Sequence, residues 1–295
     1  MLRPIYTFTL LLVLLSTFLF SYTATPSKAY TGANNYTTAK DGTSIFYTTA
    51  GKGNITLLFV HCWTCDQTYW RKQLDYFAQN YQVVALDLAG HGKSGRNRKS
   101  YTMQTFGGDV AAVAEALKLK KVILIGHSMG GPVIAEAANQ MPGKVIGLIG
   151  VDTFKDLDWH PSTEEIDKML QPIKVNFKDS LRHIVRNGMF LPTSDSLLAE
   201  QTATHMSSAP PEIGIPAVQN MFEWRGEKEL GALTIPKWMI NAEYQPTNKE
   251  VAAKYGFKLK LMSGVGHFPM LEDATTFNKL LSEAITQIKS EAASK

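Results

Sequence analysis

The sequence contains few cysteines and no strong excess of charge of one sign. Its 295 residues include two cysteines, Cys62 and Cys65, which are too few for a disulfide-stabilised scaffold. Lys and Arg number 30 against 26 Asp and Glu, and the net charge of +4 comes from scattered basic residues. The densest basic run, residues 93–99, contains glycine and is typical of a solvated loop. We therefore expect no nucleic-acid partner.

The overall composition is that of a globular protein. Hydrophobic residues make up 44% of the chain and charged residues 19%, which is enough apolar surface for a sizeable core. The sequence also has no internal repeat and no low-complexity tract. These properties exclude disordered, collagen-like and coiled-coil proteins.

A long apolar run occurs at the N-terminus. Arg3 precedes it, and it covers residues 5–20. Because the run is shorter than the roughly 20 residues that span a bilayer, it predicts a signal peptide over residues 1–24 and a secreted or periplasmic protein. An uncleaved N-terminal membrane anchor is the alternative. The mature chain would begin at Thr25 or at Tyr30.

Downstream, apolar runs of strand length alternate with stretches of helical periodicity. Strands are expected at residues 44–49, 56–60, 82–86, 121–125, 145–151, 236–241 and 258–262. Helices are expected at residues 70–79, 103–117, 131–140 and 275–290. This alternation predicts an α/β fold in which helices flank a mostly parallel sheet.

Strand signals are lost over residues 154–233, where helix-like segments are separated by six prolines. This predicts an all-helical insertion between two parts of one core, residues 36–153 and 234–290. A polar linker over residues 25–35 and a tail over residues 291–295 complete the expected organisation. The large apolar residues of the insertion should face the carboxyl edge of the sheet, most of them as core and a few lining a pocket. They are Met169, Phe177, Met189, Phe190, Met206, Met221, Phe222 and Trp224.

The sharpest chemical signal is the segment Gly126-His-Ser128-Met-Gly130. It follows a continuously apolar strand and opens a predicted helix. In this context a Gly-x-Ser-x-Gly motif lifts the serine hydroxyl over the sheet edge, and the glycines avoid collisions with the neighbouring strand and helix. The pattern indicates Ser128 as a nucleophile.

Together with three further motifs, this segment makes the chain similar to the α/β-hydrolase superfamily. Residues 59–63, Phe-Val-His-Cys-Trp, resemble the loop that supplies an oxyanion donor in that family. Residues 87–95 resemble its Asp-x-x-Gly-x-Gly-x-Ser turn, and residues 264–272 match its histidine loop. The resemblance covers residues 36–288. It implies the α/β-hydrolase fold, in the branch with a serine nucleophile and a helical cap inserted after the sixth strand.

The chemistry of serine assigns roles to other residues. A serine hydroxyl needs a positioned base, and imidazole can take its proton and return it to the leaving group. His267 is the expected base because it follows a late strand in a glycine-rich loop. The backbone N–H groups of Trp63 and Met129 are expected to hold the oxyanion. The remaining histidines are expected to be structural: His61, His91, His127, His160, His183 and His205.

The acid of the expected triad departs from the common pattern of the family. Gln245 stands where an Asp usually follows the seventh strand, and a neutral amide does not stabilise an imidazolium as a carboxylate does. Two carboxylates keep the chain order nucleophile, acid, histidine. Asp152, at the end of the sixth strand, is favoured because a short side chain there is rigidly held. Glu243, two residues before Gln245, is the alternative acid.

The two cysteines lie in the expected oxyanion loop, where Cys62 replaces a glycine of the family. In an exported protein, a disulfide between Cys62 and Cys65 would stiffen this loop. A thioredoxin-like redox pair is disfavoured because the chain is too long and carries the serine and histidine motifs. A zinc site lacks a second pair of ligands, and the sequence has no dinucleotide or Walker fingerprint. We therefore expect neither a metal nor a cofactor.

These observations predict a secreted serine hydrolase that cleaves carboxylic esters, or related acyl substrates, through an acyl-enzyme. The expected partner is a small-molecule ester. The alternative is a ligand-binding protein on the same scaffold with little or no turnover, because the fold does not fix the function. The glutamine at position 245 and the altered oxyanion loop motivate that alternative.

Overall fold

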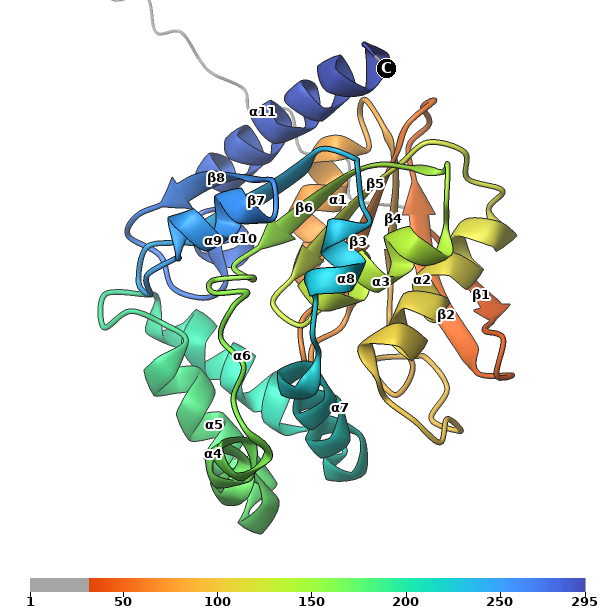
Figure 1. The fold of residues 1–295 in the computed structure, drawn as a ribbon. Coiled ribbons are helices and arrows are strands. Elements are labelled where there is room, and N and C mark those ends of the chain that lie inside the picture. Colours follow the sequence, from red (N-terminus) through yellow and green to blue (C-terminus); the bar gives the residue numbers. More distant parts are fainter. Residues whose placement is uncertain (1–31, 295) are drawn as a thin grey trace, which may run out of the picture.

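A sheet of eight strands forms the centre of residues 32–294, the part of the chain described in this computed structural model (Figure 1). The strand order is β1-β2-β4-β3-β5-β6-β7-β8. Strands β3 to β8 are parallel to one another, whereas β2 pairs antiparallel with β1 and β4. The strands are β1 (Ala33–Thr38), β2 (Ser44–Ala50), β3 (Thr56–Val60), β4 (Gln82–Leu86), β5 (Val122–His127), β6 (Val145–Val151), β7 (Lys237–Ala242) and β8 (Phe257–Met262).

Helices cover both faces of the sheet (Figure 1). Helix α2 packs on α3, and α11 packs on α1. Strands β3 and β5 are buried along their whole length, which explains their continuous apolar sequences. The elements outside the sheet and the insertion are η1 (Gln67–Trp70), α1 (Arg71–Phe77), α2 (Met103–Ala116), α3 (Gly130–Gln140), α9 (Lys249–Lys254), α10 (Pro269–Glu272) and α11 (Ala274–Ala293).

Three details differ from the sequence-based expectations. Strand β1 begins at Ala33, so the expected linker over residues 25–35 is wrong at its end. This edge strand is mostly exposed or half-buried and therefore lacks an apolar run. Helix α11 continues to Ala293, past the expected tail boundary at residue 290. The short helices α9 and α10 were not predicted because each has at most six residues and little periodicity.

Five helices lie between β6 and β7, within residues 154–233. The first four gather beyond the carboxyl ends of the strands, whereas the fifth, α8 (Glu227–Gly231), packs beside α3 on the core (Figure 1). Ser162 and Glu165 form a capping box that begins the first of them. The second buries Phe177, Leu181 and Val185, spaced by four residues along one face. The five helices are α4 (Thr163–Val175), α5 (Phe177–Gly188), α6 (Ser196–Ser207), α7 (Pro211–Glu223) and α8 (Glu227–Gly231).

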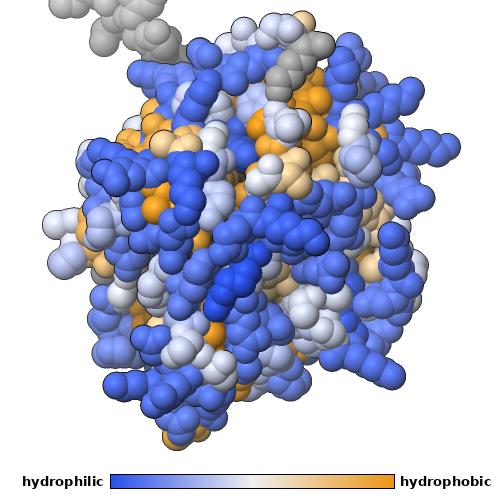
Figure 2. All heavy atoms as spheres, in the orientation of Figure 1, coloured by the Kyte–Doolittle hydropathy of each residue, from blue (hydrophilic) through white to orange (hydrophobic). Residues whose placement is uncertain are grey.

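The face of the molecule in Figure 2 is mainly hydrophilic, and hydrophobic residues show in small areas between polar ones. Within residues 32–294, every helix is too short or too polar to cross a membrane. The expected signal peptide over residues 1–24 lies outside the described residues.

Candidate active site

Ser128 occupies the sharp turn between β5 and α3. Its backbone has a φ of 53°, in the left-handed region that residues other than glycine rarely adopt. The turn is held by two hydrogen bonds: Ser128 N–H donates to the carbonyl of Val151 at 2.9 Å, and Thr153 Oγ1 donates to the carbonyl of Ser128 at 2.9 Å. A Cβ atom on Gly126 would lie 2.2 Å from the carbonyl oxygen of Gly130. The glycine at position 126 is therefore required by close packing of the strand against the helix.

His267 lies in the loop after β8 and is fixed by its backbone. Its N–H donates to the carbonyl of Met189 in the helical insertion at 2.7 Å. Its carbonyl accepts a hydrogen bond from His127 Nε2, also at 2.7 Å. The ring then donates through Nδ1 to Asp152 Oδ2, at 2.6 Å. The tautomer with the proton on Nδ1 leaves Nε2 as the acceptor nitrogen.

Asp152 is the carboxylate that the structure brings to His267. It directly follows β6, its backbone has a φ of 42°, and its side chain is fully buried. The second oxygen, Oδ1, accepts from the N–H of Ala242 at 2.9 Å and lies 2.8 Å from Lys155 Nζ. Burial alone would raise the pKa of this carboxyl, but the hydrogen bond and charge of His267, followed by Lys155, lower the pKa below its usual value. Asp152 is thus held as a carboxylate.

Glu243, the alternative acid, does not join this group. Its side chain is exposed, and its N–H pairs with the carbonyl of Met262 as β7 ends. Gln245 is also exposed. The ring of His267 has two side-chain partners, Asp152 at 2.6 Å and the hydroxyl of Tyr244 at 3.2 Å. The geometry therefore favours Asp152 over Glu243.

Ser128 and His267 both line two cavities. The first has a volume of about 420 Å³, and we call it the polar cavity because charged and other polar side chains lie among its aromatic ones. Its walls include Asp152, Phe154, Lys155, Asp156, Trp159, His160, Phe222, Trp224, Tyr244 and Gln245. The second has a volume of about 190 Å³, and we call it the apolar cavity. Its walls include Cys62, Trp63, Met169, Leu170, Ile173, Ile184, Met189, Met206, Val218, Met221 and Phe222.

More residues of the insertion line these cavities than the sequence led us to expect. Of the eight large apolar residues singled out there, six contribute to a cavity wall: Met169, Met189, Met206, Met221, Phe222 and Trp224. Only Phe177 and Phe190 are core residues outside both walls. The expectation of a few lining residues was wrong because the cavities lie between the insertion and the core, where these side chains meet the residues around Ser128.

The expected oxyanion donors flank the serine. Met129 precedes the first residue of α3, and Trp63 lies in the loop after β3. Among the described residues, neither of these two amides donates a hydrogen bond. The indole of Trp63 donates to the carbonyl of Gly214 in α7 at 2.7 Å, which anchors the loop to the insertion. Of the two residues, Trp63 lines the apolar cavity together with Ser128.

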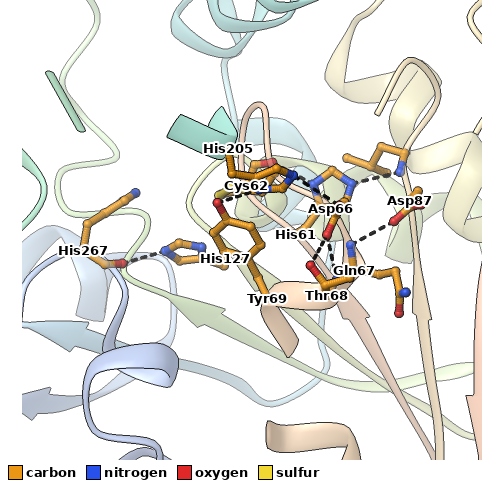
Figure 3. The surroundings of a disulfide bond; sticks show 12 residues. His61, Cys62, Asp66, Gln67, Thr68, Tyr69, Asp87, His127, His205 and His267 are labelled. Carbon is orange, nitrogen blue, oxygen red and sulfur yellow. Dashed lines mark hydrogen bonds and ion pairs between the residues drawn. A yellow bond between two sulfur atoms is a disulfide. The ribbon is translucent and has the colours of Figure 1, made fainter. Parts of the chain in front are cut away.

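A disulfide closes the Trp63 loop. Cys62 and Cys65 are joined, with their Cα atoms 5.3 Å apart, and Cys65 N–H donates to the carbonyl of Cys62 (Figure 3). Beside it, His205 of α6 contacts the hydroxyl of Tyr69 at 3.0 Å and pairs with Asp66 at 3.4 Å. These contacts link the insertion to the core next to the disulfide.

Three histidines of the matched motifs are buried and neutral. His61 Nδ1 donates to the carbonyl of Cys62, and its Nε2 accepts from the N–H of Leu88 (Figure 3). Burial lowers the pKa of His61 to about 3, that of His91 to about 4 and that of His127 to about 3. They hold loops together and do not reach either cavity that contains Ser128.

The histidines of the insertion are paired with neighbouring side chains. His160 pairs with Glu227 at 2.6 Å, and His183 contacts the amide of Asn187 at 3.1 Å. His160 also lines the polar cavity. Within residues 32–294, no cluster of three or more His, Cys, Asp or Glu side chains is placed to hold a metal ion.

Sequence reasoning missed two residues of the site. Lys155 contacts the carboxylate of Asp152, and Tyr244 contacts the ring of His267. Each lies within three residues of a position that the motifs single out, Asp152 or Gln245. Proximity to a strand end was the available signal. The contact of Lys155 with Asp152 is local, within one turn, whereas the contact of Tyr244 with His267 joins the loops after β7 and β8 and cannot be read from one segment.

Comparison with known proteins shows the family of this chain. The model of the alpha/beta hydrolase fold family matches residues 55–208, just over half of the chain. A dihydrolipoyllysine-residue acetyltransferase component of an acetoin cleaving system, from Cupriavidus necator, is 29% identical over 82% of this chain and 67% of its own length. A non-heme chloroperoxidase from Streptomyces lividans is 39% identical over 37% of this chain, and the match spans 40% of that protein.

Solved structures share the fold. An esterase from Exiguobacterium antarcticum has a TM-score of 0.76 and 20% identity, covering 87% of this chain and 100% of the other. A bromoperoxidase from Bacillus anthracis has a TM-score of 0.76 and 19% identity, covering 86% of this chain and 100% of the other. The predicted fold is confirmed, and this chain belongs to the α/β-hydrolase fold family.

Proposed function

We propose that this α/β hydrolase is a serine hydrolase that cleaves carboxylic esters through an acyl-enzyme. The observation that carries the proposal is the 2.6 Å hydrogen bond from His267 Nδ1 to Asp152 Oδ2, in a cavity that Ser128 also lines. This bond orients the ring so that its free nitrogen can act as a base toward a hydroxyl. Ser128 Oγ is not among the present partners of the ring. Such contacts are often long without substrate and shorten in the complex.

The proposed reaction proceeds in two halves. Ser128 Oγ attacks the ester carbonyl carbon while His267 Nε2 takes the hydroxyl proton. The imidazolium then gives this proton to the departing alkoxide, which leaves as an alcohol. In the second half, water attacks the acyl carbon while His267 takes its proton, and the imidazolium returns this proton to Ser128 Oγ as the bond to the acyl carbon breaks and the carboxylic acid is released. Asp152 stabilises the imidazolium in both halves.

The N–H groups of Trp63 and Met129 would stabilise the negative oxygen of the tetrahedral intermediate. Donors already fixed in place cost no reorganisation during the reaction, and one such donor contributes about 3 kcal/mol in other enzymes. The disulfide between Cys62 and Cys65 supports this role because it restricts the loop that carries Trp63.

The two cavities indicate how an ester would lie. The apolar cavity contains Trp63, so we assign it to the acyl group, whose carbonyl must face the oxyanion donors. The polar cavity is lined by both Ser128 and His267, so we assign it to the leaving alcohol, which receives a proton from His267 Nε2. A cavity of about 150 Å³ holds benzene. The apolar cavity, about 190 Å³, therefore favours short to medium acyl chains.

Labelling with a fluorophosphonate tests the proposal, because only an activated serine reacts rapidly with this probe. Mass spectrometry should find the label on Ser128 in the wild type and no label in Ser128→Ala. Absence of labelling at Ser128 in folded wild-type protein would contradict the proposal and favour a ligand-binding protein on a hydrolase scaffold.

We also propose that the protein is exported. The apolar run over residues 5–20 supports this, as does the disulfide, because disulfides persist mainly in oxidising compartments. N-terminal sequencing of protein from the medium or periplasm should find Thr25 or Tyr30 first. Protein found only in the cytosol, with residues 1–24 intact, would contradict export.

A further inference from the structure

Lys155 lies against the carboxylate that binds His267. Its Nζ is 2.8 Å from Asp152 Oδ1, the oxygen that does not contact the imidazole. The same ammonium donates to the carbonyl oxygens of Ala242 and Gln245, at 2.9 and 3.3 Å. An ammonium has three N–H donors, so these protein groups occupy all of them. All three donors of Lys155 therefore bind protein groups, and none is left for a substrate.

These contacts connect the ends of two strands. Asp152 follows β6, whereas Ala242 ends β7. The turn after β6 is conformationally costly, because Asp152 and Phe154 have φ values of 42° and 53°. Such a backbone persists only where its surroundings hold it. Lys155 supplies part of that restraint by joining the turn to the end of β7, with its ammonium 4.8 Å from the ring centre of Tyr244.

The charge of Lys155 acts on the same group. The side chain of Asp152 has no exposed surface, and a buried carboxylate is costly without compensating partners. A cation at this position stabilises the carboxylate. The charge of Lys155 is one of the causes that lower the pKa of Asp152 below its usual value. Lys155 therefore stabilises the ionised form of the carboxylate that binds His267.

Other titratable groups near the ring are neutral or already paired. The hydroxyl of Tyr244 lies 3.2 Å from His267 Nδ1, and burial together with the charge of Asp152 raises the pKa of this tyrosine. The ring of His127 is centred 4.7 Å from that of His267, and burial lowers the pKa of His127. The remaining titratable side chains around the site all have partners. Glu272 accepts hydrogen bonds from the N–H groups of Gly266 and Phe268, Asp156 accepts one from Asn248, and His160 pairs with Glu227.

We propose that Lys155 is a positioning residue of the triad, which fixes the carboxylate of Asp152 beside His267 and keeps that carboxylate ionised to lower pH than the site would otherwise allow. The proposal rests on the proposed function, because it assumes that His267 activates Ser128. The contacts of Lys155 with Asp152, Ala242 and Gln245 carry it.

A pH profile separates this role from a purely structural one. The rate of Ser128 labelling by a fluorophosphonate reports on the base without requiring the natural substrate. It is measured across the acidic and neutral range for wild type, Lys155→Met, Lys155→Gln and Lys155→Arg. In Lys155→Met and Lys155→Gln, which lack the charge, we expect the acidic limb of the profile of labelling rate against pH to move to higher pH by about half to one unit. The labelling rate on the plateau should fall roughly tenfold as the carboxylate loses its restraint. Lys155→Arg should keep the limb at the wild-type position.

The matched control is Lys258→Met, which removes an exposed lysine on β8 that pairs with Glu291. It should leave the limb in place. If Lys155→Met does not fold, Lys155→Gln gives the same comparison, since it keeps hydrogen-bonding capacity without the charge. A limb that stays at the wild-type pH in a folded neutral variant overturns the proposal. Absence of labelling in the wild type instead contradicts the proposed function, so the two failures are distinguishable.

Discussion

The ring of His267 binds the carboxylate of Asp152 although the two residues lie 115 positions apart in the chain. The parallel sheet makes this contact possible, because β6 and β8 both end at the edge where the helical insertion begins (Figure 1). The left-handed backbone of Asp152 turns the chain immediately after β6. An acid at this position therefore reaches His267 from the end of β6, whereas the acid of the family usually follows the seventh strand.

Replacing Gly126 by alanine should destabilise the turn that carries Ser128. The added Cβ would lie 2.2 Å from the carbonyl of Gly130, and backbone at that distance must shift. We expect a loss of about 1–3 kcal/mol in the free energy of unfolding, measured by urea denaturation. Gly188→Ala is the matched control, because a Cβ at Gly188 meets nothing within 4 Å. Equal stability of the two variants would argue against the packing requirement at position 126.

Acid should destabilise the protein partly through His127. Burial and then the charge of His267 lower the pKa of His127 from 6.5 to about 3, so the unfolded chain binds a proton there that the folded protein excludes. The stability that neutral His127 provides is complete above pH 6.5 and is lost as the pH falls toward 3. The loss is about 1.4 kcal/mol per pH unit inside this window.

The variant His127→Gln isolates this effect, since glutamine does not titrate and can still donate to the carbonyl of His267. Urea denaturation of both proteins at several pH values gives the difference. The wild type should lose stability more steeply than the variant on acidification. Parallel pH dependences would show that His127 takes up its proton without unfolding.

The apolar cavity should set the acyl-chain preference. Met206 is buried in its wall, so Met206→Trp removes space for the end of an acyl chain. We expect kcat/KM for p-nitrophenyl octanoate to fall more than about tenfold, whereas the value for the acetate stays within about twofold. An equal loss for both esters would indicate that the chain lies elsewhere.

Reduction of the disulfide should slow turnover by loosening the loop of Trp63. The indole of Trp63 still binds Gly214, so we expect a partial loss of kcat, about tenfold or less, with little change in KM. Steady-state kinetics with and without a phosphine reductant measures it. A variant with serine at both positions 62 and 65 should show the reduced value throughout and no response to the reductant. Full activity of the reduced wild type would contradict the proposed role of the disulfide in holding the loop of Trp63.

The sequence predicted the buried strands and the turn that carries Ser128 well, because both depend on local patterns. Strand β3 and most of β5 consist of apolar residues, because both strands are buried. The glycines around Ser128 are needed because the strand, the turn and the helix pack closely against one another. Strand β1 was missed because an exposed edge needs no apolar alternation. Its pairing with β2 comes from backbone hydrogen bonds, which leave no trace in composition.

The site itself was only partly predictable. Asp152 and Glu243 both follow strands, and only the spatial arrangement of those strand ends separates a buried carboxylate from an exposed one. The contacts of Lys155 and Tyr244 arise from two different loops that meet at this edge. The wall of methionines over Ser128 depends likewise on how α4 to α7 fold over the sheet.

The most direct measurement compares the two candidate acids during hydrolysis of p-nitrophenyl butyrate. Asp152→Asn removes the charge beside His267 with little change of shape, and Glu243→Gln does the same at the exposed position. The account predicts that kcat falls about 10⁴-fold in Asp152→Asn, as in other triads whose acid is neutralised, and stays within about twofold of wild type in Glu243→Gln. Full activity in a folded Asp152→Asn protein, or a large loss in Glu243→Gln alone, would contradict it.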